Sequence, residues 1–297
     1  MKNNRKWMIT MALLFCITAG VAAQDHSSIR TLVITGAAPY GYHPWKNNIE
    51  LIEPRLEAFG LDKPKYHIAK GLEDWRKWEG DYHNFDAIVI IYYWSQAPEA
   101  ELEKLDQYVR DGGALVVVHS ALAGFWKQDI FDHWTGIAYR ERDSEYGHSL
   151  AFDKEGKKMV LPPGKGKGSG HAPIDTFRIH TRDPGHPIMK DLPETWMQSE
   201  DELYYNLRGP NPNLQVLAVA RAHDGTYAPQ AWVRNHGEGR IFSLTPGHHQ
   251  PGASSVGFIT LLARGIEWAA TGDVTFEVPS NFPGEHTPST ALPRFER

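Results

Sequence analysis

The chain has 297 residues, of which 31 are Lys or Arg and 36 are Asp or Glu, and its formal net charge is −5. This acidic balance, without a stripe of Lys and Arg, argues against nucleic acid as a partner. The length suits one large α/β domain, and the single Cys excludes a disulfide framework, so the hydrophobic core must hold the protein together.

The first 23 residues have the pattern of a secretory signal peptide. A basic start precedes an apolar run over residues 8–19 and small residues that end at Ala23. Lipidation at Cys16 is the weaker alternative, because the bulky Phe15 stands where such a site requires a small residue. The apolar run is too short for a permanent membrane anchor. We therefore expect cleavage after Ala23 and a periplasmic or secreted mature chain without a membrane span.

Strand and helix signals then alternate. Aliphatic runs predict buried strands, and apolar residues at helical spacing predict the segments between them. The predicted strands cover residues 31–35, 66–69, 86–91 and 114–118, and the predicted helices cover residues 45–59 and the segment from Pro98 to Gly113. This order implies right-handed crossovers and a doubly wound, mostly parallel sheet.

The second half of the chain is less regular. Residues 162–170 are rich in Gly, Pro and Lys but lack the spacing of a phosphate-binding loop, so we expect a solvated loop or a mobile lid and no nucleotide cofactor. Further strands are predicted at residues 175–180, 215–220, 230–234 and 240–245, and a last helix at residues 254–270. We expect the mature α/β domain to occupy residues 24–278 and a Pro-rich tail to occupy residues 279–297.

Imidazoles stand where two predicted strands end. His119 follows the run 114–118, and Gly247-His248-His249 follows the run 239–245. Ligands of parallel α/β sheets gather at the carboxyl ends of the strands, and His is suited to proton transfer or metal binding near neutral pH. Ser120 lacks the flanking glycines of a nucleophile elbow, so it is more consistent with a hydrogen bond to a neighbour or a helix cap.

Other residues beside turns extend this candidate site. His43 and His148 also lie next to turns, and Asp201-Glu202 adds carboxylates. Two or three imidazoles with a carboxylate would suit Zn²⁺ or a similar divalent ion, but the spacing matches no recognised zinc motif. A metal-free acid/base cluster is the alternative. His186 precedes Pro187 and is interpreted as a structural residue that ends a loop by hydrogen bonding.

Several short motifs, in their order along the chain, resemble the ThuA-like (trehalose utilisation) family over roughly residues 30–271. The motifs are Val118-His119-Ser120-Ala121, Phe125-Trp126, Gly147-His148, His186-Pro187-Ile188, Asp201-Glu202-Leu203-Tyr204, Ala231-Trp232-Val233, Gly239-Arg240-Ile241-Phe242, Gly247-His248 and Arg264-Gly265-Ile266-Glu267-Trp268-Ala269.

The resemblance implies a flavodoxin-like α/β fold similar to that of class I glutamine amidotransferases, but the mature chain has no Cys for glutaminase chemistry. The resemblance also implies that residues far apart in the sequence form one pocket. The expected catalytic residues are His119, His148, Glu202 and His248. The expected substrate-binding residues are His43, Trp126, Asp201 and Tyr204. A divalent ion would be held by His119, Glu202 and His248.

The resemblance further implies the processing of 3-keto-glycosides, which a partner sugar 3-dehydrogenase would produce. A ketone at C3 acidifies the proton on C2, so a base can remove it and the C1 substituent can leave by elimination. Hydration of the product would complete a net hydrolysis. Two alternatives remain open: a non-catalytic sugar-binding protein, and a metal-dependent hydrolase of an ester or amide.

Overall fold

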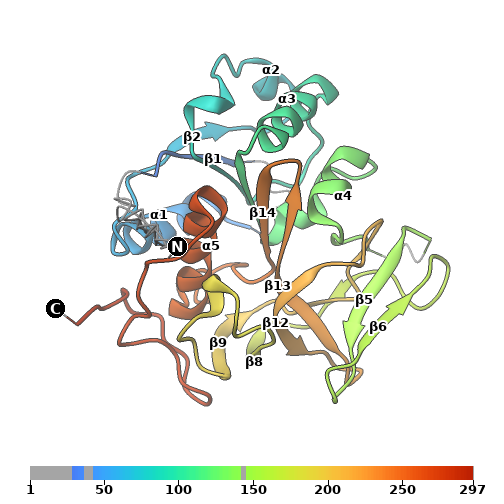
Figure 1. Cartoon of the computed structure of the whole chain (residues 1–297), viewed down its shortest axis with the longest axis vertical. Helices are drawn as coiled ribbons and strands as arrows, with labels where there is room; N and C mark the ends of the chain where they lie inside the picture. Colours follow the sequence, from blue (N-terminus) through green and yellow to red (C-terminus); the bar gives the residue numbers. More distant parts are fainter. Residues whose placement is uncertain (1–28, 37–42, 142–144, 297) are drawn as a thin grey trace, which may run out of the picture.

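The computed structural model describes residues 29–36, 43–141 and 145–296 (Figure 1). The expected signal peptide and Cys16 lie outside the described residues. In the part of the chain that is described, no helix is both long enough and apolar enough to cross a lipid bilayer.

Five parallel strands form the first part of the sheet. They are β1 (Thr31–Thr35), β2 (Lys65–Ile68), β3 (Ala87–Ile91), β4 (Ala114–Val118) and β14 (Gly239–Leu244). Their order across the sheet is β2-β1-β3-β4-β14, and every neighbouring pair is parallel. All five residues of β1, β3 and β4 are buried, as expected for strands with both faces covered.

The sheet continues into antiparallel strands. These are β5 (His148–Phe152), β6 (Lys158–Leu161), β8 (Asp175–Thr181), β9 (Thr195–Asp201), β11 (Arg208–Gly209), β12 (Gln215–Arg221) and β13 (Tyr227–His236). A separate short pair consists of β7 (Gly170–His171) and β10 (Tyr204–Tyr205). We call these nine strands the antiparallel extension. It adjoins the parallel part where β13 pairs with β14.

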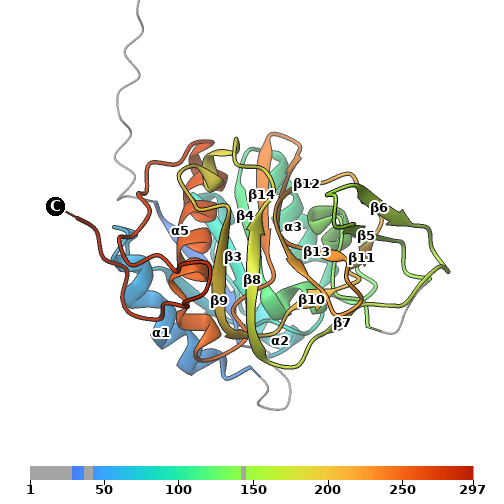
Figure 2. The same ribbon diagram turned by 90° about the horizontal axis from the view of Figure 1, so that it is seen from below.

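Helices cover both faces of the parallel strands (Figure 2). One face carries α1 (Trp45–Glu57) and α5 (Val256–Thr271), and the other carries α2 (Leu72–Arg76), α3 (Glu99–Arg110) and α4 (Asp129–Thr135). Short 3₁₀ helices are η3 (Tyr82–Asn84), η4 (His119–Ala123), η5 (Pro187–Met189) and η6 (Gly252–Ser254).

An apolar core lies on each face of the parallel strands, and successive residues of a strand point into the two cores in turn. In β3, Ile88 and Ile90 belong to the core under α3, whereas Val89 and Ile91 belong to the core under α5. The α/β class predicted from the sequence is therefore confirmed. In the described residues the sheet has 12 strands and is mixed, so the parallel arrangement is limited to its first part.

Three smaller features complete the fold. The tail packs along the protein: Val256 N–H donates to Ser289 O (2.8 Å), and the Phe295 ring lies 5.0 Å from that of Phe59. His186 Nδ1 accepts from Ile188 N–H (3.3 Å), which confirms its predicted loop-ending role. The predicted hydrogen bond of Ser120 is wrong, because its buried Oγ has no partner among the described residues.

Candidate functional site

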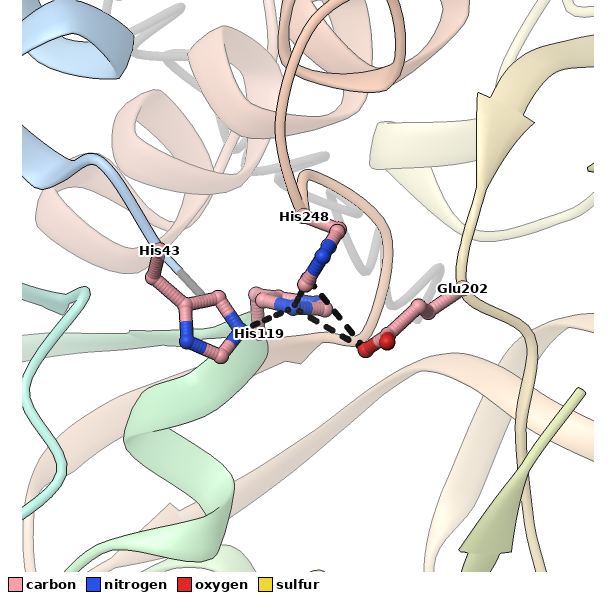
Figure 3. A group of neighbouring side chains, drawn as sticks. All are labelled: His43, His119, Glu202 and His248. Atoms are coloured by element: carbon pink, nitrogen blue, oxygen red, sulfur yellow. Dashed lines mark hydrogen bonds and ion pairs between the residues drawn. The ribbon is translucent and has the colours of Figure 1, made fainter. Parts of the chain in front are cut away.

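The site lies where the parallel strands end. His43 follows β1, Trp94 follows β3, His119 follows β4 and His248 follows β14, and these four strands are neighbours in the sheet. Because all four strands run in the same direction, their carboxyl ends meet at one edge. Figure 3 shows the three histidines converging there with Glu202.

His119 is the central and most constrained of these residues. It is fully buried, and its backbone φ of 52° lies in the left-handed region, which a non-glycine residue adopts at an energetic cost. Its Nδ1–H donates to Thr245 O at 2.6 Å, so Nε2 carries the free lone pair of a neutral ring. Burial lowers the pKa of His119 well below its usual value, and the nearby His43 and His248 lower it further.

The other two imidazoles face the same atom of His119. His43 Nε2 lies 3.2 Å from His119 Nε2, and His248 Nδ1 lies 3.1 Å from it. Burial lowers the pKa of His43 to about 4 and that of His248 to about 3. At neutral pH the cluster therefore holds uncharged imidazoles, which is the form that binds metal ions.

Glu202 comes from the antiparallel extension, directly after β9. Its Oε2 lies 3.2 Å from His248 Nδ1 and 3.8 Å from His119 Nε2. Its Oε1 lies 3.3 Å from Nδ1 of His171, a residue that sequence analysis did not single out. Burial raises the pKa of Glu202 to about 7, an effect that His171 opposes.

Asp201 holds two of these residues in place through the backbone. Its Oδ1 accepts from His248 N–H (2.9 Å) and Glu202 N–H (2.8 Å), and its Oδ2 accepts from Gly247 N–H (2.8 Å) and Gln198 Nε2 (2.8 Å). Burial raises the pKa of Asp201 to about 6, and the bonds from the backbone oppose that rise. The side chain is completely buried, so the predicted contact with substrate is wrong and Asp201 orients its neighbours instead.

The donor atoms fit a divalent cation. One ligand atom from each of His43, His119, Glu202 and His248 lies within 4.8 Å of all the others. Tetrahedral Zn²⁺ with bonds of 2.0–2.1 Å would place its nitrogens about 3.3 Å apart. This is close to the 3.2 Å and 3.1 Å that separate His119 Nε2 from His43 Nε2 and His248 Nδ1. Without an ion, the single lone pair of His119 Nε2 faces both imidazoles and the Tyr204 hydroxyl at 3.3 Å. Only one of these three groups can donate to that lone pair, whereas a bound cation could accept lone pairs from all three ring nitrogens.

A cleft of about 380 Å³ opens above the donor atoms. Its size is at the lower end of small-molecule sites, which suits a ligand of one or two sugar rings. Its lining consists of His43, Trp94, Ala123, Tyr139, Glu141, His171, Glu202, Tyr204 and His248.

The structure brings together most of the predicted site. His43, His119, Glu202, Tyr204 and His248 meet as expected, and the 3.1 Å between His119 and His248 confirms the central pair. Sequence analysis missed Trp94, Tyr139 and His171. Trp94 follows a buried strand and the strand-end rule would have found it. No local pattern marks the other two residues.

Two predicted residues lie elsewhere. His148 opens β5 and pairs with Gly209 of β11, so strand pairing places it in the antiparallel extension and not among the residues that line the cleft. Trp126 is stacked on Tyr146 (5.6 Å), with the Arg140 guanidinium 5.3 Å from its ring, and is also absent from the lining. The structure therefore does not bring His148 and Trp126 together with the four donor residues or with the residues that line the cleft.

The fold and the site define an α/β protein of flavodoxin-like type with a buried histidine–carboxylate centre at the carboxyl edge of its sheet. A family model described as trehalose utilisation, ThuA, matches residues 30–269. The chain belongs to the ThuA family, which is related to carbohydrate metabolism.

One solved structure agrees with this assignment, and a second shares the fold. A putative ThuA-like protein from Parabacteroides merdae is 30% identical, with a TM-score of 0.80 over 89% of this chain and 98% of that chain. Another from Bacteroides uniformis is 15% identical, with a TM-score of 0.54 over 87% of this chain and 98% of that chain.

The fold also occurs within larger enzymes. A β-galactosidase from Bacillus circulans sp. alkalophilus is 13% identical, with a TM-score of 0.50 over 86% of this chain and 33% of that chain. At this identity the likeness shows the fold alone. No curated protein matches the chain.

Proposed function

We propose that the protein is an exported enzyme that acts on 3-keto-glycosides, by removal of the C2 proton and elimination at C1. Membership of a carbohydrate-related family supports the substrate class. The observation that carries the enzymatic role is the buried donor set of His43, His119, Glu202 and His248 at the floor of an open cleft. A sugar 3-dehydrogenase would supply the keto-glycoside.

We further propose that these four residues hold a divalent cation such as Zn²⁺. When bound, such an ion supplies Lewis-acid stabilisation to an oxygen that gains negative charge. The neutral imidazoles and the carboxylate provide the donors, and Asp201 fixes the backbone of Glu202 and His248.

In the proposed reaction, the C2 proton is taken by a side chain that lines the cleft. His171 lines the cleft, its side chain is 46% exposed, and its Nδ1 lies 3.3 Å from Glu202 Oε1. We assign it as the base that removes the C2 proton. The electron pair of the C–H bond forms an enolate with C3. When the C3 ketone reforms, the C1–C2 double bond forms and the C1–O bond breaks. The electron pair of that bond goes to the leaving oxygen, which takes up the proton that His171 removed and departs as an alcohol.

Tyr204 supplies a hydrogen-bond donor beside the donor cluster. Burial raises the pKa of Tyr204 well above its usual range, so the hydroxyl stays protonated. Its OH, 3.3 Å from His119 Nε2, can turn to donate a hydrogen bond to the enolate oxygen or the leaving group. Addition of water across C1 and C2 then completes a net hydrolysis.

One other catalytic function is favoured by a specific observation. Three histidines with one carboxylate also suit a metal-dependent hydrolase of an ester or amide. That enzyme would cleave model esters or amides and would need no ketone at C3.

The test incubates the purified protein with methyl 3-keto-glucoside and with methyl glucoside, each with and without a chelator. We expect turnover of the keto compound alone, its loss with chelator and its recovery when Zn²⁺ is added back. In D₂O the hydrated product should carry deuterium at C2. Product without deuterium at C2 would contradict elimination, and cleavage of esters or amides without a ketone would favour the hydrolase. Inertness towards both sugars, with tight binding, would favour a binding protein.

A further inference from the structure

The two walls of the cleft are both aromatic but come from different parts of the molecule. Trp94 lies on the parallel side, with its ring 6.0 Å from that of His43. Tyr139, His171 and Tyr204 also line the cleft, and the Tyr139 and Tyr204 rings are 4.7 Å apart. Aromatic faces of this kind pack well against the C–H face of a pyranose ring, while the floor provides polar donors and acceptors.

Trp94 is unusual among its neighbours because it is not buried. Tyr92 and Tyr93 are each 0% exposed, whereas Trp94 is 37% exposed. A large apolar side chain left open within a cleft indicates a site for a ligand.

The backbone around Trp94 is held firmly. Tyr92, with a φ of 52°, donates its hydroxyl to Gly247 O in the loop that carries His248. The Tyr93 hydroxyl donates to Gln96 O at 2.6 Å, and Ser95 O accepts from Phe125 N–H at 2.9 Å. The indole is thus presented from a fixed loop that is bonded to the donor cluster, which suits a rigid binding surface.

We infer that Trp94 is the platform on which a sugar ring stacks, with the ring held between Trp94 and the Tyr139–Tyr204 wall above the four donor residues. This inference rests on the proposed function for its substrate class. The ligand is a small glycoside of one or two rings, because the cleft is about 380 Å³.

The test compares two tryptophans. Trp94→Ala removes the proposed platform, and Trp94→Phe keeps an aromatic face. Trp126→Ala is the matched control, because Trp126 stacks on Tyr146 outside the cleft lining. Binding of methyl 3-keto-glucoside is measured by calorimetry, turnover by KM and kcat, and the fold by bound Zn²⁺ and melting temperature.

We expect Trp94→Ala to weaken binding and raise KM by about tenfold with little change in kcat, and Trp94→Phe to recover most of that loss. Bound Zn²⁺ should stay at the wild-type level in both variants. Wild-type affinity in Trp94→Ala, or loss of affinity in Trp126→Ala alone, would overturn the inference.

Failure of the proposed function would look different. If the wild-type protein binds the keto-glucoside without turning it over, the elimination chemistry is wrong. The calorimetric comparison of Trp94→Ala with Trp126→Ala still decides whether Trp94 is the platform, because it needs no catalysis.

Discussion

The parallel part of the sheet contributes His43, His119 and His248 to the donor cluster, whereas the antiparallel extension contributes Glu202 to the cluster and His171 to the cleft lining. The two parts lie side by side in Figure 1. In the parallel part, the strands end at the same edge of the sheet, which places His119 and His248 directly at the site. In the extension, the position of a residue depends on which short strands pair with each other. The four donor residues therefore come together only when both parts of the sheet are folded against each other.

The largest expected effect comes from removing one donor in each part. His119→Ala and Glu202→Gln should each lower turnover of methyl 3-keto-glucoside by more than about 100-fold, since even residues that only support metal ligands contribute 10–100-fold. Bound Zn²⁺, measured by atomic absorption, should fall in both variants. If Glu202→Gln kept full Zn²⁺ content and full activity, Glu202 would not be a metal ligand. The antiparallel extension would then contribute no donor to the proposed metal site.

The second-largest effect is expected at Asp201, which links the loop after β14 to the antiparallel extension. Asp201→Asn keeps the size of the side chain but turns a buried acceptor of four hydrogen bonds into a group that also donates. Facing a buried N–H with another donor costs about 1–3 kcal/mol. We expect a loss of that size in urea unfolding and a 10–100-fold loss of Zn²⁺ affinity. An unchanged affinity with reduced stability would limit Asp201 to a structural role.

The pH dependence of the metal-free protein tests the buried imidazoles. The pKa of His248 is lowered to about 3 in the folded protein, so the unfolded chain takes up this proton first as the pH falls below about 6.5. The stabilising contribution of neutral His248 is present above that pH and is lost as the pH falls. Asp201 and Glu202, whose pKa values are raised to about 6 and about 7, act in the opposite sense.

Comparison with His248→Asn isolates the histidine, since the acids remain in both proteins. As the pH falls from about 6 to about 4, the free energy of unfolding of the wild-type protein should decrease more steeply than that of His248→Asn. The difference in slope should be about 1.4 kcal/mol per pH unit, which corresponds to one proton. Chelator-treated protein is unfolded in urea at each pH. Equal slopes would show that His248 is not held neutral by burial.

The smallest effect is expected at the outer strands of the extension. His148→Ala should change KM and kcat by less than about twofold, because His148 pairs with Gly209 in strands away from the cleft lining. Activity lost at constant melting temperature and Zn²⁺ content would return His148 to the site and contradict the described arrangement.

The parallel part was predictable because its signals are local. The run 114–118 is long enough to read as a buried strand, so His119 could be placed at its end without knowledge of the rest of the chain. The same rule applies to β3 and Trp94. For His43 and Glu202 the local signals were weaker, a nearby turn and a pair of carboxylates, and the family resemblance supported their place in the site. Each is separated in sequence from the histidines that it contacts.

The extension was less predictable because its contacts depend on register. His171 reaches Glu202 because β7 pairs with β10, where His171 lies opposite Tyr204. A two-residue strand has no detectable period in a sequence. Gly147-His148 had the pattern of a turn beside a strand, but β5 pairs with β11 and β13, which places it in the extension.

The exposed loop that joins β6 to β7 divides the donor residues equally. A chain break near Gly164 would leave His43 and His119 on one fragment and Glu202 and His248 on the other. Neither fragment alone would carry more than two of the four donors. The protein therefore offers a place to divide the chain into a split reporter, in which recovery of the proposed metal binding would signal that two separately expressed fragments have reassembled.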